Sequence, residues 1–323
     1  MQNKKVVILG VGGTIAGIAS NPSGNPKSNV EYTAGEVGVP DLVGTIAVLR
    51  LSDLIETEQV ARIDSKDMSF AVWTVLAARV QHHLARLDVG GVVITHGTDT
   101  LEETAYFLQS VLNPAKPVVL TCAMRPASAL VPDGPQNVLD AVTVASHEGA
   151  HGVVVVCAGT IHSALDVQKI HTYQLQAFGS GDVGAIGFIE ENSLKTMKNL
   201  PVNQQIHAQA ATENIALLNR MDTWPVVEIV MNYPCASCVL VDALVVVGVQ
   251  GLVVAGTGNG TVHHVLEAAL LKAQAQGAEV VRATGCTQGR VLLRADDHFA
   301  ASNGLSPVKT RIALMLRLMG INT

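Results

Sequence analysis

Charged and aromatic side chains are scarce in this chain of 323 residues, at 15% and 3%. Hydrophobic residues make up 48%, so there is enough apolar surface for large cores. The net charge is −6 and there is no long basic run, which argues against binding to nucleic acid or to an anionic membrane surface. We therefore expect neither nucleic acid nor a membrane as a partner.

Cysteine is also rare, and the count of five is odd. Two cysteines, Cys122 and Cys157, lie inside apolar runs, which argues against a disulfide framework. Cys235 and Cys238 have the C-x-x-C spacing of a redox or zinc pair, but no second pair follows at metal spacing, so we interpret the motif as incidental. None of the 11 histidines has H-x-x-H spacing, and we interpret them as surface or satisfied polar groups rather than metal ligands. We expect no metal and no cofactor.

A long uninterrupted apolar run is missing as well. The most apolar window, 239–256, is broken by Asp242, Gln250 and glycines, and it predicts two buried strands rather than a membrane span. Val6–Leu9 follows Lys4 and Lys5 directly and predicts a first strand rather than a leader. These features favour the cytoplasm, with the periplasm as the alternative if a signal peptide has been removed.

Short valine-rich runs are present and alternate with amphipathic stretches. The runs lie at 6–9, 92–95, 118–122 and 153–158, and they are typical of strands buried on both faces. Helical apolar spacing covers 70–87, 101–112 and 137–148. The alternation predicts an α/β protein with a doubly wound, mainly parallel, flavodoxin-like sheet.

A polar stretch near 190–212 divides the chain. We predict an N-terminal α/β domain over 1–195, a linker over 196–211 and a smaller C-terminal α/β domain over 212–323. In the second domain, strands are expected at 226–231, 243–248, 252–256 and 280–284, and a helix at 263–276 that ends before Gly277. Ser306 and Pro307 predict the start of a last helix.

In an open parallel sheet, the functional site lies in the loops that follow the carboxyl ends of the strands. The first such loop, 10–17, is rich in glycine but departs from G-x-G-x-x-G because position 15 is Ile, and it lacks a Walker lysine. It does offer the hydroxyl of Thr14 on a turn with backbone N–H groups nearby. Such groups could hold a developing oxyanion.

Two further loops carry reactive side chains. Thr98 and Asp99 follow the run at 92–95, where a capped helix N-terminus is the simpler explanation of the loop taken alone and is compatible with a role in chemistry. Lys169 follows the run at 153–158. It becomes a candidate base only if it reaches Thr98 and Asp99.

Seven segments together resemble the bacterial-type L-asparaginase and glutaminase-asparaginase family. They occur in order along nearly the whole chain, at 12–17, 96–105, 116–119, 123–126, 133–135, 256–260 and 305–311. The resemblance implies a homotetrameric amidohydrolase with sites at subunit interfaces. It implies Thr14 as the nucleophile and Tyr32 as the tyrosine of a lid, for which the Gly-, Pro- and Asn-rich stretch 21–29 is suited.

The resemblance also implies roles for the other site residues. Thr98, Lys169 and Asp99 form a second catalytic set, in which the lysine relays a proton and the carboxylate steadies its charge. Asp99 also binds the substrate ammonium and, with Thr98, lines the substrate site, while Ser65 binds the carboxylate. The main chain of Ala123 contacts the leaving amide. A neighbouring subunit contributes Asn259.

Two features depart from the family pattern. Lys66 stands where the family often has glutamine, and a lysine there repels the substrate ammonium unless it turns outward or pairs with an acid. The glutamate that a neighbouring subunit offers has no clear match in this chain. Lys66 bears on the affinity for substrate and on the preference between asparagine and glutamine. We assign the role of the glutamate to no residue.

We thus expect hydrolysis of the side-chain amide of L-asparagine to L-aspartate and ammonia through an acyl-enzyme on Thr14. Three alternatives stay open. The protein could be a glutaminase-asparaginase, an amidotransferase subunit, or a protein that binds asparagine or aspartate without turnover.

Overall fold

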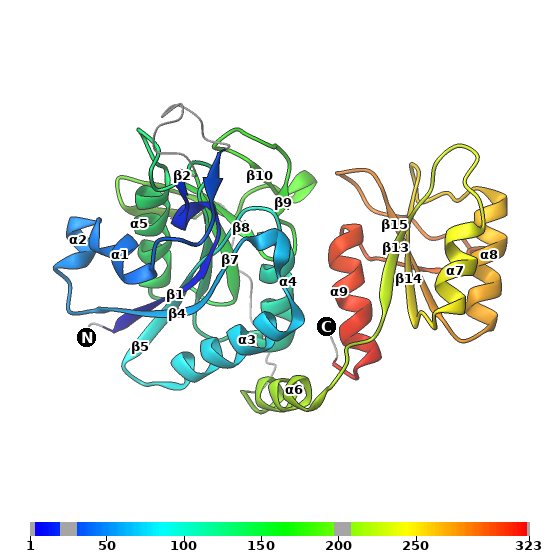
Figure 1. Cartoon of the computed structure of the whole chain (residues 1–323), viewed down its shortest axis with the longest axis horizontal. Helices are drawn as coiled ribbons and strands as arrows, with labels where there is room; N and C mark the ends of the chain where they lie inside the picture. The colour runs from blue at the N-terminus through cyan, green and yellow to red at the C-terminus, as the bar shows by residue number, and fades with distance from the viewer. Residues whose placement is uncertain (1–3, 20–30, 197–207, 322–323) are drawn as a thin grey trace. The chain divides into compact units, whose positions relative to one another are not determined.

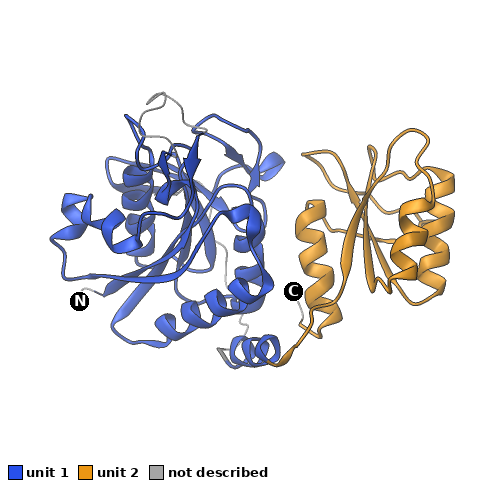
Figure 2. Cartoon of the chain, in the orientation of Figure 1, with its two compact units in different colours: residues 1–219 blue, residues 220–323 orange. Residues whose placement is uncertain are grey.

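The computed structural model describes residues 4–19, 31–196 and 208–321. It forms two compact units, 1–219 and 220–323, coloured separately in Figure 2. Most of the predicted linker, 196–211, and all of the predicted lid stretch, 21–29, lie outside the described residues. Helix α6 (Ala208–Arg220) ends at the boundary between the two units.

The first unit is built on an eight-stranded sheet. Its order is β12 (Ser193–Thr196), β11 (Gly187–Glu190), β8 (Thr160–Ser163), β7 (Val153–Cys157), β6 (Val118–Thr121), β5 (Val89–Thr95), β1 (Lys5–Gly12) and β4 (Ile55–Ile63). The five strands from β7 to β4 are parallel, and β8, β11 and β12 extend the sheet in antiparallel fashion. The parallel strands follow the flavodoxin-like order second, first, third, fourth, fifth, which confirms the predicted fold class.

Helices cover both faces of this sheet (Figure 1). On one face, α1 (Val39–Gly44) and α5 (Gly134–Ala145) share a core cluster with Val6, Ile8 and Val119. On the other face lie α3 (Phe70–Ala85) and α4 (Leu101–Leu112), joined by stacked rings of Trp73 and Phe107. Burial from both sides explains why the central strands read as nearly continuous valine runs.

Short elements occupy the loops at the carboxyl ends of these strands. They are the strands β2 (Ile18–Ala19), β3 (Tyr32–Thr33), β9 (Gln168–Lys169) and β10 (Phe178–Gly179), together with single 3₁₀ turns at Thr14–Ala16, Ser65–Asp67 and Gly181–Val183. A small helix, α2 (Ala47–Arg50), follows α1. Because these loops carry most of the predicted site residues, the parallel sheet fixes where the candidate site lies.

The second unit is a smaller parallel sheet, as predicted. Its order is β13 (Val227–Met231), β14 (Gly251–Gly256), β15 (Glu279–Thr284) and β16 (Ala300–Ala301). Helices α7 (Val239–Val246) and α8 (His264–Ala275) cover one face, and α9 (Pro307–Leu318) covers the other (Figure 2). Ser306 caps α9 by accepting a bond from the Lys309 amide, also as predicted.

One prediction in this unit is wrong. Residues 243–248 were expected to form a strand, but they belong to helix α7 and the turn that ends at Gly248. A run of valines and leucines is apolar on every side, so its periodicity cannot distinguish a helix from a strand. The helix buries Val241 and leaves Val239, Leu240 and Val246 exposed, and Val247 directly after it is exposed as well. Within the described residues, no helix is both long and apolar enough to span a bilayer.

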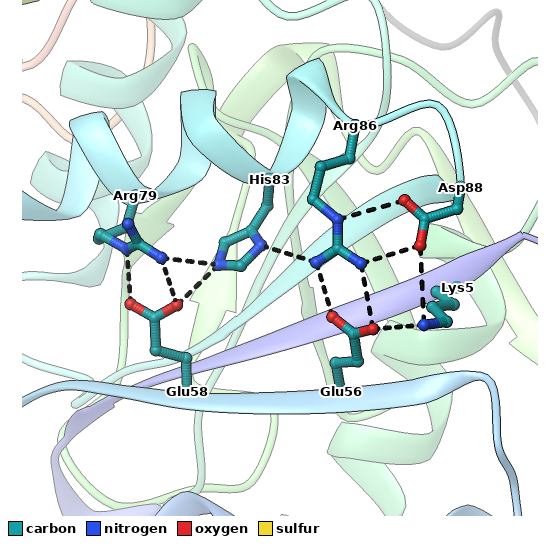
Figure 3. A network of polar contacts seen from close by, with 7 residues as sticks. All are labelled: Lys5, Glu56, Glu58, Arg79, His83, Arg86 and Asp88. Carbon is teal, nitrogen blue, oxygen red and sulfur yellow. Dashed lines mark hydrogen bonds and ion pairs between the residues drawn. The ribbon is translucent and has the colours of Figure 1, made fainter.

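A network of charged side chains fastens β4 to α3 (Figure 3). The guanidinium of Arg79 donates two hydrogen bonds to the Glu58 carboxylate, at 2.6 and 2.8 Å. The guanidinium of Arg86 donates two to the Glu56 carboxylate, at 2.6 and 3.1 Å. Lys5 on β1 adds a bond of 2.6 Å to Glu56. The hydrogen bonds from Arg86 and then Lys5 hold the pKa of Glu56 down at about 2.

We expect Glu56→Gln to lower the free energy of unfolding by about 1–2 kcal/mol at neutral pH, because its ion pairs with Arg86 and Lys5 are lost. The loss stays this small because the network is partly exposed to solvent. A carboxylate whose pKa falls from 4.5 to about 2 on folding stabilises the protein above pH 4.5. That contribution is lost as the pH falls from 4.5 towards 2. Denaturant titrations should therefore show a gap between variant and wild type at pH 7 that narrows at pH 3. An undiminished gap at pH 3 contradicts this, and Glu190→Gln on exposed β11 is the matched control.

Candidate active site

Two glycines bring the loops after β1 and β5 into contact. Gly13 has φ +83°, and a Cβ there would lie 2.2 Å from the Cα of Gly97. A Cβ on Gly97 would lie 2.4 Å from the Oγ of Ser65. Only glycine permits such an approach at both positions. The two strands flank the switch point of the sheet, which is where open α/β sheets place their ligands.

Thr14 lies in this contact region, in the 3₁₀ turn that follows β1. Its side chain is buried, with 7% of the residue exposed. Its Oγ1 lies 2.7 Å from the hydroxyl of Tyr32 on β3. Gly17 leaves room for the ring, since a Cβ there would lie 2.7 Å from Cδ2 of Tyr32. The Gly13 N–H donates to the carbonyl of Ile63 at 2.9 Å, so this amide is already used within the fold.

Thr98, Asp99 and Lys169 form a second polar group. The Nζ of Lys169 donates to Thr98 Oγ1 at 2.8 Å and to Asp99 Oδ1 at 2.6 Å. Lys169 lies on β9, where it pairs with Phe178 of β10. The structure therefore brings together three side chains that the sequence places up to 71 positions apart. This meets the condition set for Lys169 from the sequence.

The same group has the charge balance needed to activate a hydroxyl. The ammonium of Lys169 touches both the Thr98 oxygen and a carboxylate, so the pair can hold or pass a proton at Thr98 Oγ1. Lys169 is mostly covered, with 20% of its side chain exposed, whereas Asp99 is 54% exposed. The Asp99 carboxylate can thus offset the positive charge of Lys169 and still accept hydrogen bonds from a bound cation.

Ser65 packs against the Thr98–Asp99 loop. Its Oγ accepts the N–H of Asp99 at 3.2 Å, and its carbonyl accepts the Thr100 hydroxyl at 2.8 Å. Ser65 is buried and precedes Lys66 in a 3₁₀ turn capped by Asp64. A hydroxyl that accepts one bond keeps its own proton as a donor. Ser65 can therefore donate to an anionic group.

Lys66 pairs with acids. Its Nζ lies 2.5 Å from Asp67 Oδ2 and 3.6 Å from Asp64 Oδ2. The side chain is 60% exposed, and the Asp67 carboxylate, followed by Asp64, raises the pKa of Lys66. Two carboxylates offset its positive charge, so the repulsion of a bound ammonium is weaker than the sequence alone suggests.

The sequence interpretation missed a buried chain of hydrogen bonds behind Thr98. The indole of Trp73 donates to Thr104 Oγ1, which lies 2.9 Å from Nε2 of His96. Because a carbonyl can only accept, Nδ1 of His96 carries the proton and donates to the Gly97 carbonyl at 2.7 Å. Nε2 of the neutral ring then accepts from the Thr104 hydroxyl. Burial lowers the pKa of His96 to about 4, which fits a neutral ring that fixes the peptide before Thr98.

The turn after β6 is held from α5. Ala123 is fully buried, and the next two amides, of Met124 and Arg125, each donate to Asp133 at 2.9 Å. Asn137 adds a bond from its Nδ2 to the Cys122 carbonyl at 2.8 Å. The main chain at Ala123 is therefore fixed at the carboxyl end of a strand that neighbours β5.

Asn259 lies in the second unit, in the loop after β14. Its amide group makes two bonds to the main chain of Leu292, accepting from N–H at 2.8 Å and donating to the carbonyl at 3.0 Å. Within that unit Asn259 fastens the loop around residue 292. Across residues 4–19, 31–196 and 208–321, the structure has no cluster of three or more His, Cys, Asp or Glu side chains arranged to hold a metal.

The fold and these side chains define an α/β protein with a hydroxyl-rich polar site at the switch point of its main sheet. The chain belongs to the asparaginase family. Residues 5–202 match the family model described as "Asparaginase, N-terminal", and residues 226–320 match "Glutaminase/Asparaginase C-terminal domain".

Individual relatives cover nearly the whole chain. It is 37% identical to "L-asparaginase 2" of Escherichia coli (strain K12), over 97% of this chain and 88% of that protein. It is 34% identical to the "Glutaminase-asparaginase" of Pseudomonas fluorescens biotype A, over 97% of this chain and 86% of that protein. The crystal structure titled "Probable Cytoplasmic L-asparaginase" from Campylobacter jejuni superimposes with a TM-score of 0.88 at 35% identity, covering 98% of this chain and 95% of that one.

Proposed function

We propose that this protein hydrolyses the side-chain amide of L-asparagine through a threonine nucleophile. The observation that carries the proposal is the pair of hydroxyl sites in touching loops. Thr14 lies against Tyr32, and Thr98 lies against Lys169 and Asp99. The names of the relatives, L-asparaginase and glutaminase-asparaginase, support the same reaction class.

In this mechanism, the Thr14 oxygen attacks the amide carbon and its proton goes to a neighbouring base. The C–N bond then breaks, ammonia leaves with an added proton, and an ester remains on Thr14. Water, activated at Thr98 and Lys169, attacks the ester and releases aspartate and the free threonine. Asp99 binds the substrate ammonium, Ser65 binds its carboxylate, and the Ala123 main chain contacts the leaving amide.

The deciding experiment measures ammonia release from L-asparagine, D-asparagine and L-glutamine over a range of concentrations. We expect L-asparagine to give the highest kcat/KM. Comparable kcat/KM on L-glutamine would support a glutaminase-asparaginase, which the named Pseudomonas relative favours as the second candidate. Calorimetric binding of asparagine without any ammonia release would overturn the catalytic proposal.

Lys66→Gln tests whether Lys66 affects the choice of substrate. We expect kcat/KM for either amide to change by less than about fivefold, because an exposed ion pair contributes about 0–1 kcal/mol. Steady-state kinetics on both substrates checks this. A change of preference greater than about tenfold would show that Lys66 leaves Asp64 and Asp67 and acts on the substrate.

We further propose a homotetramer in which a neighbouring subunit contributes Asn259. The exposed apolar side chains on α7 support association with other copies, since exposed patches of this kind mark contact surfaces. Light scattering on the eluted protein measures the oligomer mass, and a monomer at micromolar concentration would contradict the proposal. The cytoplasmic location stays a prediction that cell fractionation tests, because relatives carry both "cytoplasmic" and "periplasmic" in their names.

A further inference from the structure

The first unit contains a cavity of about 550 Å³ beside the first turns of α5. It is open to solvent on one side, and it is lined by Arg125, Val131 and Pro132, by the turn between β7 and β8, and by the turn between β11 and β12. None of Thr14, Thr98, Asp99 or Lys169 lines it, so it is separate from the candidate active site. Its volume falls in the usual range for small-molecule sites.

Two polar residues in the wall already have their partners. The carboxylate of Asp133 accepts the N–H groups of Met124 and Arg125. The amide of Asn137 donates to the Cys122 carbonyl and accepts the Ala158 N–H at 3.0 Å. Asp133 and Asn137 therefore have a structural role in the cavity wall. The remaining polar side chains are the ones that can bind a ligand.

Asp140 is the most unusual of these groups because it is a buried carboxylate, with 3% of the residue exposed. Gln136 Nε2 donates to its Oδ1 at 2.8 Å, and this is its one hydrogen bond in the described part of the chain. A carboxylate offers about four acceptor positions, so most of its capacity remains. Burial raises the pKa of Asp140, and a cation placed beside it would restore the charged form.

A second carboxylate, Glu191, lines the cavity from the turn between β11 and β12. Glu191 and Asn192 have φ of +49° and +57°, so the turn holds both in the left-handed region, which asparagine adopts more readily than glutamate. The guanidinium of Arg125 donates to the Val131 carbonyl at 3.1 Å, on its own loop.

The charge of the lining follows from these residues. Three carboxylates, those of Asp133, Asp140 and Glu191, face one guanidinium, that of Arg125, which gives 1 − 3 = −2 when all are ionised. Apolar wall is supplied by Leu175 and Ile189. The cavity thus combines a net negative charge and the unused acceptor positions of Asp140 with a patch of hydrocarbon. This suits a ligand with a positive donor on a short apolar chain.

We propose that this cavity binds a small organic cation of the primary alkylammonium class. The ammonium lies between Asp140 and Glu191, and the alkyl chain packs on Leu175 and Ile189. The site is distinct from the proposed nucleophile and proton-transfer groups, since none of Thr14, Thr98 and Lys169 lines it. Asp133 and Asn137 in its wall also hold the turn at Ala123.

The test is a calorimetric titration of the full-length protein with n-butylammonium. We expect saturable binding with a Kd of about 1 mM, as a ligand of this size permits. The uncharged analogue n-butanol should bind at least about tenfold more weakly, since it lacks the charge that two carboxylates recognise. Equal affinity for the two probes, or no saturable heat, overturns the proposal.

Variants locate the site. Asp140→Asn keeps the shape and can still accept from Gln136, and we expect it to weaken butylammonium binding by about tenfold. Glu191→Gln, on a surface turn, covers the case in which the buried variant fails to fold, and Glu190→Gln is its matched control with wild-type affinity. Asp99→Asn tests the candidate active site. Loss of binding in Asp99→Asn, with wild-type affinity in Asp140→Asn and Glu191→Gln, would place the cation at the active site and overturn the proposal.

Discussion

Thr14→Ala should lower the rate of ammonia release from L-asparagine by at least about 10³-fold, because removal of a nucleophile leaves only binding and electrostatic stabilisation. The loss should fall on kcat, since Asp99 and Ser65 still hold the two charged ends of the substrate. The removed atoms are few and the residue is small, so the melting temperature should stay within a few degrees of wild type.

Thr14→Ser is the matched control because it keeps the attacking oxygen. We expect it to retain measurable turnover, reduced by the loss of the methyl group that packs in the 3₁₀ turn. Incubation of wild type with substrate followed by rapid acid quench and mass spectrometry should show added acyl mass on the peptide that contains Thr14. Full ammonia release by Thr14→Ala, or acyl mass at another residue, would sink the assignment.

Lys169→Met should lower kcat by about 10²–10⁴-fold, the range of a lost general base. The lysine contacts both Thr98 and Asp99, so its removal also leaves the Asp99 carboxylate without its ion-pair partner. Thr98→Ala should be impaired to a similar degree, because the same proton path is broken. Stopped assays of ammonia and aspartate in parallel separate the two half-reactions.

Lys195→Met is the control for the loss of one surface charge, because Lys195 is exposed on β12. Its kinetics should match wild type. If Lys169→Met retained more than a tenth of the wild-type kcat, Lys169 would be a structural ion-pair partner and the proton would move by another route. Comparing the burst of ammonia with the steady release of aspartate then shows whether Thr98 acts before or after the acyl-enzyme.

The sequence predicted the centre of the main sheet better than its edges. Strands β5 to β7 are buried on both faces and therefore appear as valine runs. The edge strand β4 reads Ile-Glu-Thr-Glu-Gln-Val-Ala-Arg-Ile, and it was missed because its glutamates serve the ion-pair network with α3. Helix α4 matches its prediction over 101–112. Its apolar residues recur at helical spacing among polar ones, so the helical period is visible in the sequence. The apolar run of α7 offers no such contrast.

The individual site residues could be identified from the sequence, but most of the hydrogen bonds that hold them in place could not. Loop position after a strand selected Thr14, Thr98 and Lys169 as candidates, and the sheet order brings the last two into contact. The orientation of His96 depends on Trp73 in α3 and Thr104 in α4, so no local pattern reveals it. The partners of Lys66 are its near neighbours Asp64 and Asp67, and this pairing could have been proposed from the sequence.

The contact between Gly13 and Gly97 couples the loop after β1 to the loop after β5 through their backbones. Neither loop can shift towards the other, since no side chain separates the two backbones to be compressed. A displacement of the Thr14 loop towards Gly97 therefore pushes on the peptide that precedes Thr98, and we expect the positions of the two hydroxyl groups to be coupled. A library of substitutions should show this as epistasis, in which changes near Gly97 alter the tolerance of residues near Gly13, although the two lie 84 positions apart in the chain.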